Sequence, residues 1–76
     1  MDVPIEFGAK MKRLHDAAGL SQEQLGLRCG MHLSVISRLE RGLRNPRLTT
    51  IARVAGALEV TPSELVEEVR AVRPIA

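Results

Sequence analysis

The sequence has few aromatic residues and few cysteines. Phe7 is the only aromatic residue among 76, and Trp and Tyr do not occur. Proteins that bind single-stranded nucleic acid stack bases on aromatic side chains, and this chain offers no such platform. Cys29 is the only cysteine, so an intrachain disulfide is excluded and the fold depends on packing, which fits a reducing compartment. We therefore expect a cytoplasmic protein.

Long hydrophobic runs are also missing. No segment approaches the roughly 20 apolar residues of a membrane span. The first twenty residues carry Asp2, Glu6 and Asp16, which is unlike a secretory signal. The overall composition, 45% hydrophobic and 26% charged, is typical of soluble globular proteins. These features predict a single domain over residues 1–76 with no membrane segment, and the short chain predicts a small core.

Positive charge is concentrated in one part of the chain. The net charge is only +2, but five arginines and one acid, Glu40, lie between Arg28 and Arg47. A basic segment of this kind indicates a polyanionic partner. An ordinary solvated face explains the same charge equally well, so charge alone does not decide between the two.

The spacing of apolar residues predicts an all-α protein, because no run reads as a strand. Ser21, with Gln24 three residues later, matches a capping box, and Thr61-Pro62 followed by Glu64 is a second start signal. Gly26 lies inside a helix, which favours a close crossing by another helix. The expected helices span about 5–18, 21–30, 33–41, 48–58 and 62–73.

Two short helices joined by a glycine-containing turn, at about residues 21–41, form a helix-turn-helix. The second of these helices fits the major groove of duplex DNA, while the first braces it across the backbone. Close packing of the two helices requires small residues where they cross. Gly26 and Gly30 meet that need.

Several short motifs carry a resemblance to a known family. They are Gly19 to Leu25 (GLSQEQL), Gly30, Ile36 to Gly42 (ISRLERG) and Asn45-Pro46. Together they resemble the Cro/lambda-repressor (XRE) family over about residues 7–66. The resemblance implies a compact five-helix DNA-binding domain, usually a homodimer on a near-palindromic operator. The recognition helix would be 33–41.

The resemblance also implies roles for individual residues. The residues expected to face base edges are Leu33, Ser34, Ser37 and Arg38. The residues expected to contact phosphates are Gln22, Arg41, Arg44, Asn45 and Arg47, and Gln22 would also brace the recognition helix. For Arg38 the alternatives are a solvated arginine or a phosphate contact instead of a guanine contact, and for the later arginines a solvated loop.

Three positions depart from the family pattern. His32 stands where the family usually has Ser or Thr as a helix cap, and His is a poorer cap. Leu33 stands where a polar base reader is common, and it cannot form hydrogen bonds with a base. His15 replaces an arginine that commonly pairs with the glutamate of the recognition helix, here Glu40. We expect a His15–Glu40 contact that weakens at high pH, where histidine is neutral.

A second stripe of apolar residues lies near the C-terminal end. It consists of Leu65, Val66, Val69 and Val72. The stripe is longer than a thin five-helix core needs, although Leu65 fits that core. The surplus indicates a self-complementary interface of a homodimer.

No catalytic or metal-binding constellation is present. Cys29 and His32 form a C-x-x-H pair, but two ligands do not make a zinc site, so a core thiol and a helix cap are expected instead. The acids Glu64, Glu67 and Glu68 fit a helix N-terminus and a solvated face. We expect no cofactor, no metal and no enzymatic activity.

The sequence thus predicts a transcriptional regulator that binds double-stranded DNA as a homodimer, with a restriction–modification controller as one subtype. Two alternatives remain open. One is an antitoxin-like protein that neutralises a partner protein and regulates its own synthesis. The other is a helix-turn-helix used only as a protein-interaction module. Salt-dependent binding to DNA distinguishes the transcriptional regulator from the helix-turn-helix that serves only as a protein-interaction module.

Overall fold

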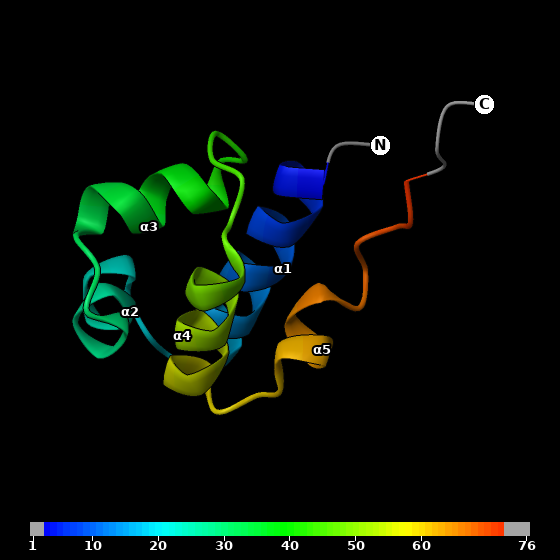
Figure 1. Cartoon of the computed structure of the whole chain (residues 1–76). Coiled ribbons are helices and arrows are strands. Elements are labelled where there is room, and N and C mark those ends of the chain that lie inside the picture. Colours follow the sequence, from blue (N-terminus) through cyan, green and yellow to red (C-terminus); the bar gives the residue numbers. More distant parts are fainter. Residues whose placement is uncertain (1–2, 73–76) are drawn as a thin grey trace.

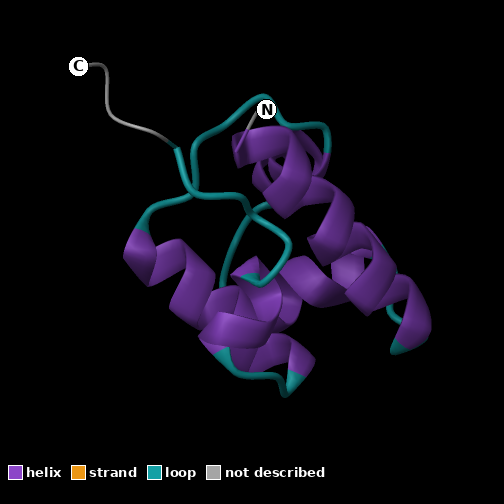
Figure 2. Cartoon of the chain, turned by 90° about the vertical axis from the view of Figure 1, so that its right-hand side faces the viewer, coloured by secondary structure: helices purple, strands orange, loops and turns teal. Residues whose placement is uncertain are grey.

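The computed structural model describes residues 3–72, and their regular structure is entirely helical (Figures 1 and 2). The helices are α1 (Val3–Ala17), α2 (Gln22–Cys29), α3 (Leu33–Glu40), α4 (Leu48–Leu58) and α5 (Pro62–Val66). Within these residues no helix is both long and apolar enough to cross a membrane. The prediction of an all-α fold with five helices is confirmed.

The helices form a small bundle with the helix-turn-helix at one end. Helix α2 packs against α3 and α4, and α1 packs against α3, α4 and α5. Figure 1 shows α3 across the end of the bundle with one side turned away from the other helices, and α5 on the opposite side of α1 and α4. The long helix α1 therefore supports α3 from behind.

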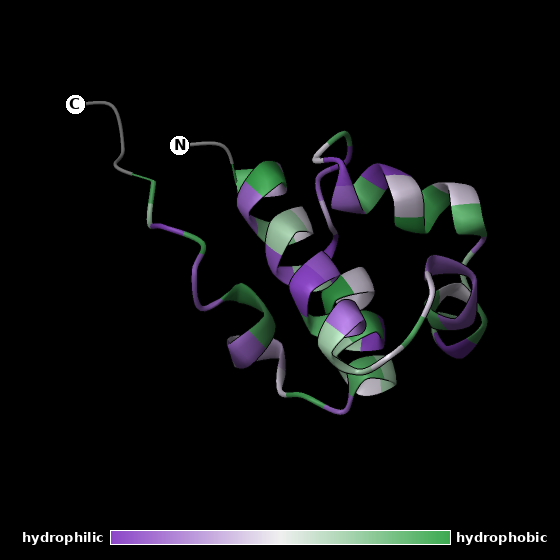
Figure 3. Cartoon of the chain, turned by 180° about the vertical axis from the view of Figure 1, so that it is seen from behind, coloured by the Kyte–Doolittle hydropathy of each residue, from purple (hydrophilic) through white to green (hydrophobic). Residues whose placement is uncertain are grey.

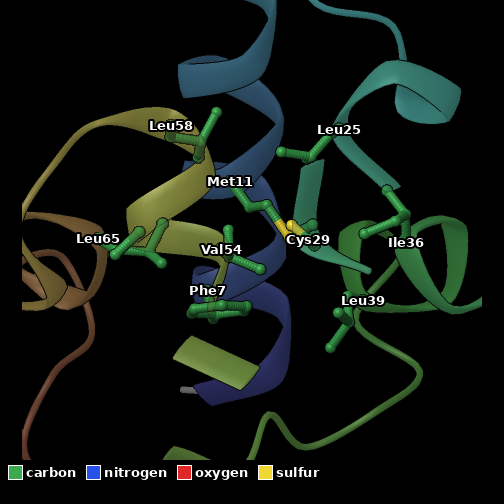
Figure 4. Close-up of a cluster of buried hydrophobic side chains, with 10 residues drawn as sticks. Phe7, Met11, Leu25, Cys29, Ile36, Leu39, Val54, Leu58 and Leu65 are labelled. Carbon is green, nitrogen blue, oxygen red and sulfur yellow. The ribbon is translucent and has the colours of Figure 1, made fainter. Parts of the chain in front are cut away.

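The core draws side chains from all five helices (Figure 4). The fully buried side chains with the largest volumes are Phe7, Met11, Leu25, Ile36, Leu39, Leu65 and Val54. Burying one such side chain contributes about 1.5–3 kcal/mol to stability. The residues predicted to face inward in α2 and α3 are buried, namely Leu25, Cys29, Ile36 and Leu39. Figure 3 shows that hydrophilic and hydrophobic residues alternate along α1.

Side-chain caps fix where α2 and α5 begin. The Gln24 amide donates to Ser21 Oγ at 3.0 Å, and the Ser21 amide donates to Gln24 Oε1 at 2.8 Å. The Glu64 amide donates to Thr61 Oγ1 at 3.1 Å. Both start signals predicted from the sequence are therefore confirmed.

The last helix is much shorter than predicted. It ends at Val66 instead of residue 73, a residue outside those described. Lys10 Nζ lies 2.9 Å from Glu67 Oε1, and Arg13 pairs with Glu68. These two ion pairs draw the chain onto α1 just after α5. The sequence alone does not reveal them because their partners are more than 50 residues apart.

Gly26 and Gly30 do not share one role. A Cβ on Gly26 would lie 2.7 Å from the Met31 carbonyl oxygen and 3.5 Å from Ile36 Cγ1, so the turn and α3 do approach closely. Gly30 has a φ of +70° and space around it. It ends α2 in the left-handed conformation that glycine adopts without strain. The expectation that Gly30 serves close packing was therefore wrong.

Candidate nucleic-acid interface

Helix α3 presents one apolar and one polar face. Ile36 and Leu39 are buried against the bundle, whereas Ser34 and Arg38 are exposed and Ser37 is half-buried. Leu33 at the tip is 45% exposed. A helix of about 10–12 Å diameter fits a major groove about 12 Å wide. The four predicted base-facing residues thus lie on the part of α3 that the bundle leaves accessible.

His32 begins α3. Its Nδ1 accepts a hydrogen bond from the Ser34 amide at 3.2 Å, and the Ser34 hydroxyl lies 3.0 Å from the same nitrogen. The prediction that His32 is a helix cap is confirmed.

A single carboxylate connects three helices behind the recognition helix. Gln22 Nε2 of α2 donates to Glu40 Oε1 of α3 at 2.8 Å, and His15 Nε2 of α1 lies 3.2 Å from Glu40 Oε2. The side chains of His15 and Glu40 are 4% and 3% exposed. The His15 ring nitrogens make no hydrogen bond within residues 3–72, so the approach of Nε2 to Oε2 is what links His15 to Glu40. His15 Nε2 also lies 3.2 Å from Asp16 Oδ1.

The chain leaves α3 through a basic loop. Arg41 caps the C-terminal end of α3, and Arg44, Asn45 and Arg47 follow with exposed side chains. Arg47 is the N-cap residue of α4, but its side chain makes no capping hydrogen bond. The amide groups at the start of α4 therefore lie beside the same cations.

Three residues beyond the predicted set border this loop. Thr49, Thr50 and Arg53 of α4 line a surface hollow together with Arg44 and Arg47. The spacing of Thr49 and Arg53, four residues apart on a helix, places them on one face. That spacing was the only sequence signal for them, and the family motif does not include it.

The predicted dimer residues are in different environments. Leu65 is fully buried inside the single chain and has no surface to offer a partner, so its assignment to an interface was wrong. Val66 and Val69 pack partly against the core, and Val72 is 75% exposed. Leu65 and Val66 belong to α5, and Val69 and Val72 follow its end.

The region around Cys29 has the properties of a core. Cys29 is 6% exposed, and burial raises the pKa of its thiol, while the charge of Arg53 lowers it in part. Among the described residues no three His, Cys, Asp or Glu side chains are grouped so as to hold a metal ion. The thiol is therefore a packing group, as predicted.

Comparisons with known proteins agree with this geometry. A helix-turn-helix family model matches residues 10–65. Control protein C.BamHI of Bacillus amyloliquefaciens is 34% identical over 67 residues, which cover 87% of this chain and 83% of that protein. The uncharacterised HTH-type transcriptional regulator y4dJ of Sinorhizobium fredii is 41% identical over 66 residues, which cover 87% of this chain and 86% of that protein.

A solved structure gives the same result. The restriction–modification controller protein C.AhdI from Aeromonas hydrophila superposes with a TM-score of 0.80 at 40% identity, covering 82% of this chain and 94% of that one. The motifs, the capped helices α2 and α3 and these likenesses point to one family. The chain belongs to the helix-turn-helix family of the Cro/lambda-repressor (XRE) type.

Proposed function

We propose that this protein is a sequence-specific regulator of transcription that binds duplex DNA with α3 in the major groove. The observation that carries the proposal is the accessible polar face of α3 beside the basic loop of residues 41–47. Such a protein acts by occupying its site, where it blocks or recruits polymerase, and it needs no catalytic group.

Base readout falls to the exposed residues of α3. We expect the exposed Arg38 to donate two hydrogen bonds to a guanine, the commonest specific contact in the major groove. Ser34 and Ser37 can donate to or accept from base edges, and Leu33 can pack on a thymine methyl group. Each good bidentate contact discriminates against a wrong base by about 1–3 kcal/mol.

Phosphate contacts hold the helix in register. Arg41, Arg44, Asn45 and Arg47 supply donors along the backbone after α3. Gln22 serves in a different way, because Glu40 occupies its amide nitrogen at 2.8 Å in the free protein. We propose that Glu40 holds Gln22 at the start of α2, where it braces α3 and reaches a phosphate.

The relatives favour the restriction–modification controller subtype. Two of the likenesses are to proteins named as controllers, C.BamHI and C.AhdI, at 34% and 40% identity. Both matches cover more than four fifths of this chain and of the relative.

We propose that the DNA-bound form is a homodimer in the cytoplasm. Val66, Val69 and Val72 supply the apolar surface for two-fold contact, with Val72 at its most exposed point. A two-fold axis there would place two α3 helices about 34 Å apart, one turn of DNA, on a near-palindromic operator.

Selection of bound sequences from a random duplex pool tests the proposal. We expect a two-fold symmetric consensus whose half-sites are one helical turn apart, with affinity that falls steeply with salt. Retention of no sequence above background, or a flat salt dependence, would contradict DNA binding and favour the protein-interaction alternative.

A further inference from the structure

A hollow of about 340 Å³ opens between the end of α3, the loop that follows it and the start of α4. Three arginines, Arg44, Arg47 and Arg53, line it. Figure 1 shows the loop after α3 running directly to the start of α4. The loop therefore brings Arg44 and Arg47 to the helix that carries Arg53.

Residues 3–72 supply no carboxylate to balance the charge of this hollow. None of its lining residues in that range is acidic. Within residues 3–72, none of the three arginines forms an ion pair with a carboxylate. Unpaired guanidinium groups around one hollow repel one another, and a bound anion would relieve that repulsion.

The neutral groups of the hollow are also suited to an anion. Thr49 and Thr50 bring hydroxyl donors, and Asn45 brings a side-chain amide. The first amide groups of the eleven-residue helix α4 have no side-chain acceptor, since Arg47 does not cap them. Guanidinium forks, hydroxyls and free amides are the donors that a tetrahedral phosphate accepts from.

We propose that Arg53 completes a phosphate-binding site with Arg44, Arg47 and the hydroxyls of Thr49 and Thr50. A phosphate of the DNA backbone is the expected source, and this part rests on the proposed function. Arg53 would then extend the backbone contacts from the loop onto α4. A free phosphate group offers the same chemistry, so the test separates the two sources.

The first arm of the test measures duplex binding against salt for the wild type, Arg53→Gln and the control Lys12→Gln. Lys12 carries the same charge on α1, where its exposed side chain pairs with Asp16 at 3.3 Å. We expect the slope of log K against log salt to fall by about 0.9 per bound chain in Arg53→Gln. The Lys12→Gln slope should equal that of the wild type.

The second arm titrates inorganic phosphate into the DNA-free protein and follows the arginine side-chain signals by NMR. A reduced slope in Arg53→Gln without a saturable phosphate response assigns the site to DNA. A saturable response that Arg53→Gln abolishes, with an unchanged slope, assigns it to free phosphate. An unchanged slope together with no saturable response overturns the site.

The two proposals fail in different ways. If the wild type itself shows no salt-dependent binding to duplex, the proposed function fails and the phosphate titration alone decides whether the site exists. If the wild type binds with a steep slope that Arg53→Gln leaves intact, the regulator stands and the source is not DNA. Equal unfolding midpoints of the three proteins show that exposed Arg53 can be replaced without loss of the fold.

Discussion

His32 caps α3 through Nδ1, which accepts a hydrogen bond from the Ser34 amide at 3.2 Å. The family pattern favours Ser or Thr at this position, and both are stronger helix caps than His.

We therefore expect His32→Asn to stabilise the protein, because Asn is among the strongest helix caps. The gain should be about 0.5–1 kcal/mol. Urea unfolding of the two proteins measures it. Equal or lower stability of His32→Asn would show that the imidazole caps α3 as well as Asn does.

Burial raises the pKa of the Cys29 thiol, and the sign of its effect on stability follows. The unfolded chain ionises this thiol at a lower pH than the folded chain does, so folding loses stability as the pH rises above the pKa of the unfolded thiol. At pH 8 the thiol should react with iodoacetamide only as fast as the native structure opens. Labelling as fast as in the urea-unfolded protein would contradict the buried position.

At the scale of elements, Glu40 fixes the arrangement of the helix-turn-helix. It contacts Gln22 of α2 at 2.8 Å and His15 of α1 at 3.2 Å from within α3. Because its side chain is 3% exposed, a partner that is removed cannot be replaced by water without rearrangement.

A double-mutant cycle tests this connection. We expect Glu40→Ala to destabilise the fold by about 1–3 kcal/mol, since it leaves the Gln22 amide without its acceptor. Gln22→Ala and Glu40→Ala should be non-additive by roughly 0.5–1.5 kcal/mol. Additive losses in chemical unfolding would show that the two side chains act independently.

The elements themselves were readable from sequence where the signal is local. The caps at Ser21 and Thr61 depend on residues within one turn, and the structure has both. Just after the end of α5, Glu67 and Glu68 pair with Lys10 and Arg13 on α1. The spacing of the valines predicted a helix that continues beyond Val66. No local sequence pattern records the ion pairs, because their partners are distant in the chain.

The candidate site also has a part that the sequence predicts and a part that only the folded chain reveals. The motif places Arg38 and the basic loop on one surface, but it does not contain Arg53, whose position follows from the packing of α4 against α2 and from the course of the loop between α3 and α4. Gly8 is a similar case, since a Cβ there would overlap carbonyl oxygens of Leu39 and Glu40. Close approach between distant segments is a property of the folded chain.

At the scale of the whole molecule, the proposed homodimer depends on the exposed apolar surface at Val72. Val72 is 75% exposed, so Val72→Glu should leave the fold of the single chain intact. In a two-fold apolar contact, the carboxylate of Val72→Glu would face the same carboxylate of the second copy. We therefore expect the wild type to be a dimer at tens of micromolar and Val72→Glu to be a monomer. Sedimentation equilibrium measures the change, and a wild type that is already monomeric would contradict the homodimer.

One binding experiment separates base reading by α3 from phosphate contact by the basic loop. Wild type, Arg38→Gln and Arg41→Gln are titrated against the selected duplex and against duplexes altered at each single base pair. Arg38→Gln should lose about 1–3 kcal/mol of discrimination at one position, whereas Arg41→Gln should weaken binding to every duplex alike and reduce the salt slope by about one. Equal, sequence-independent losses in both variants would contradict base reading by α3.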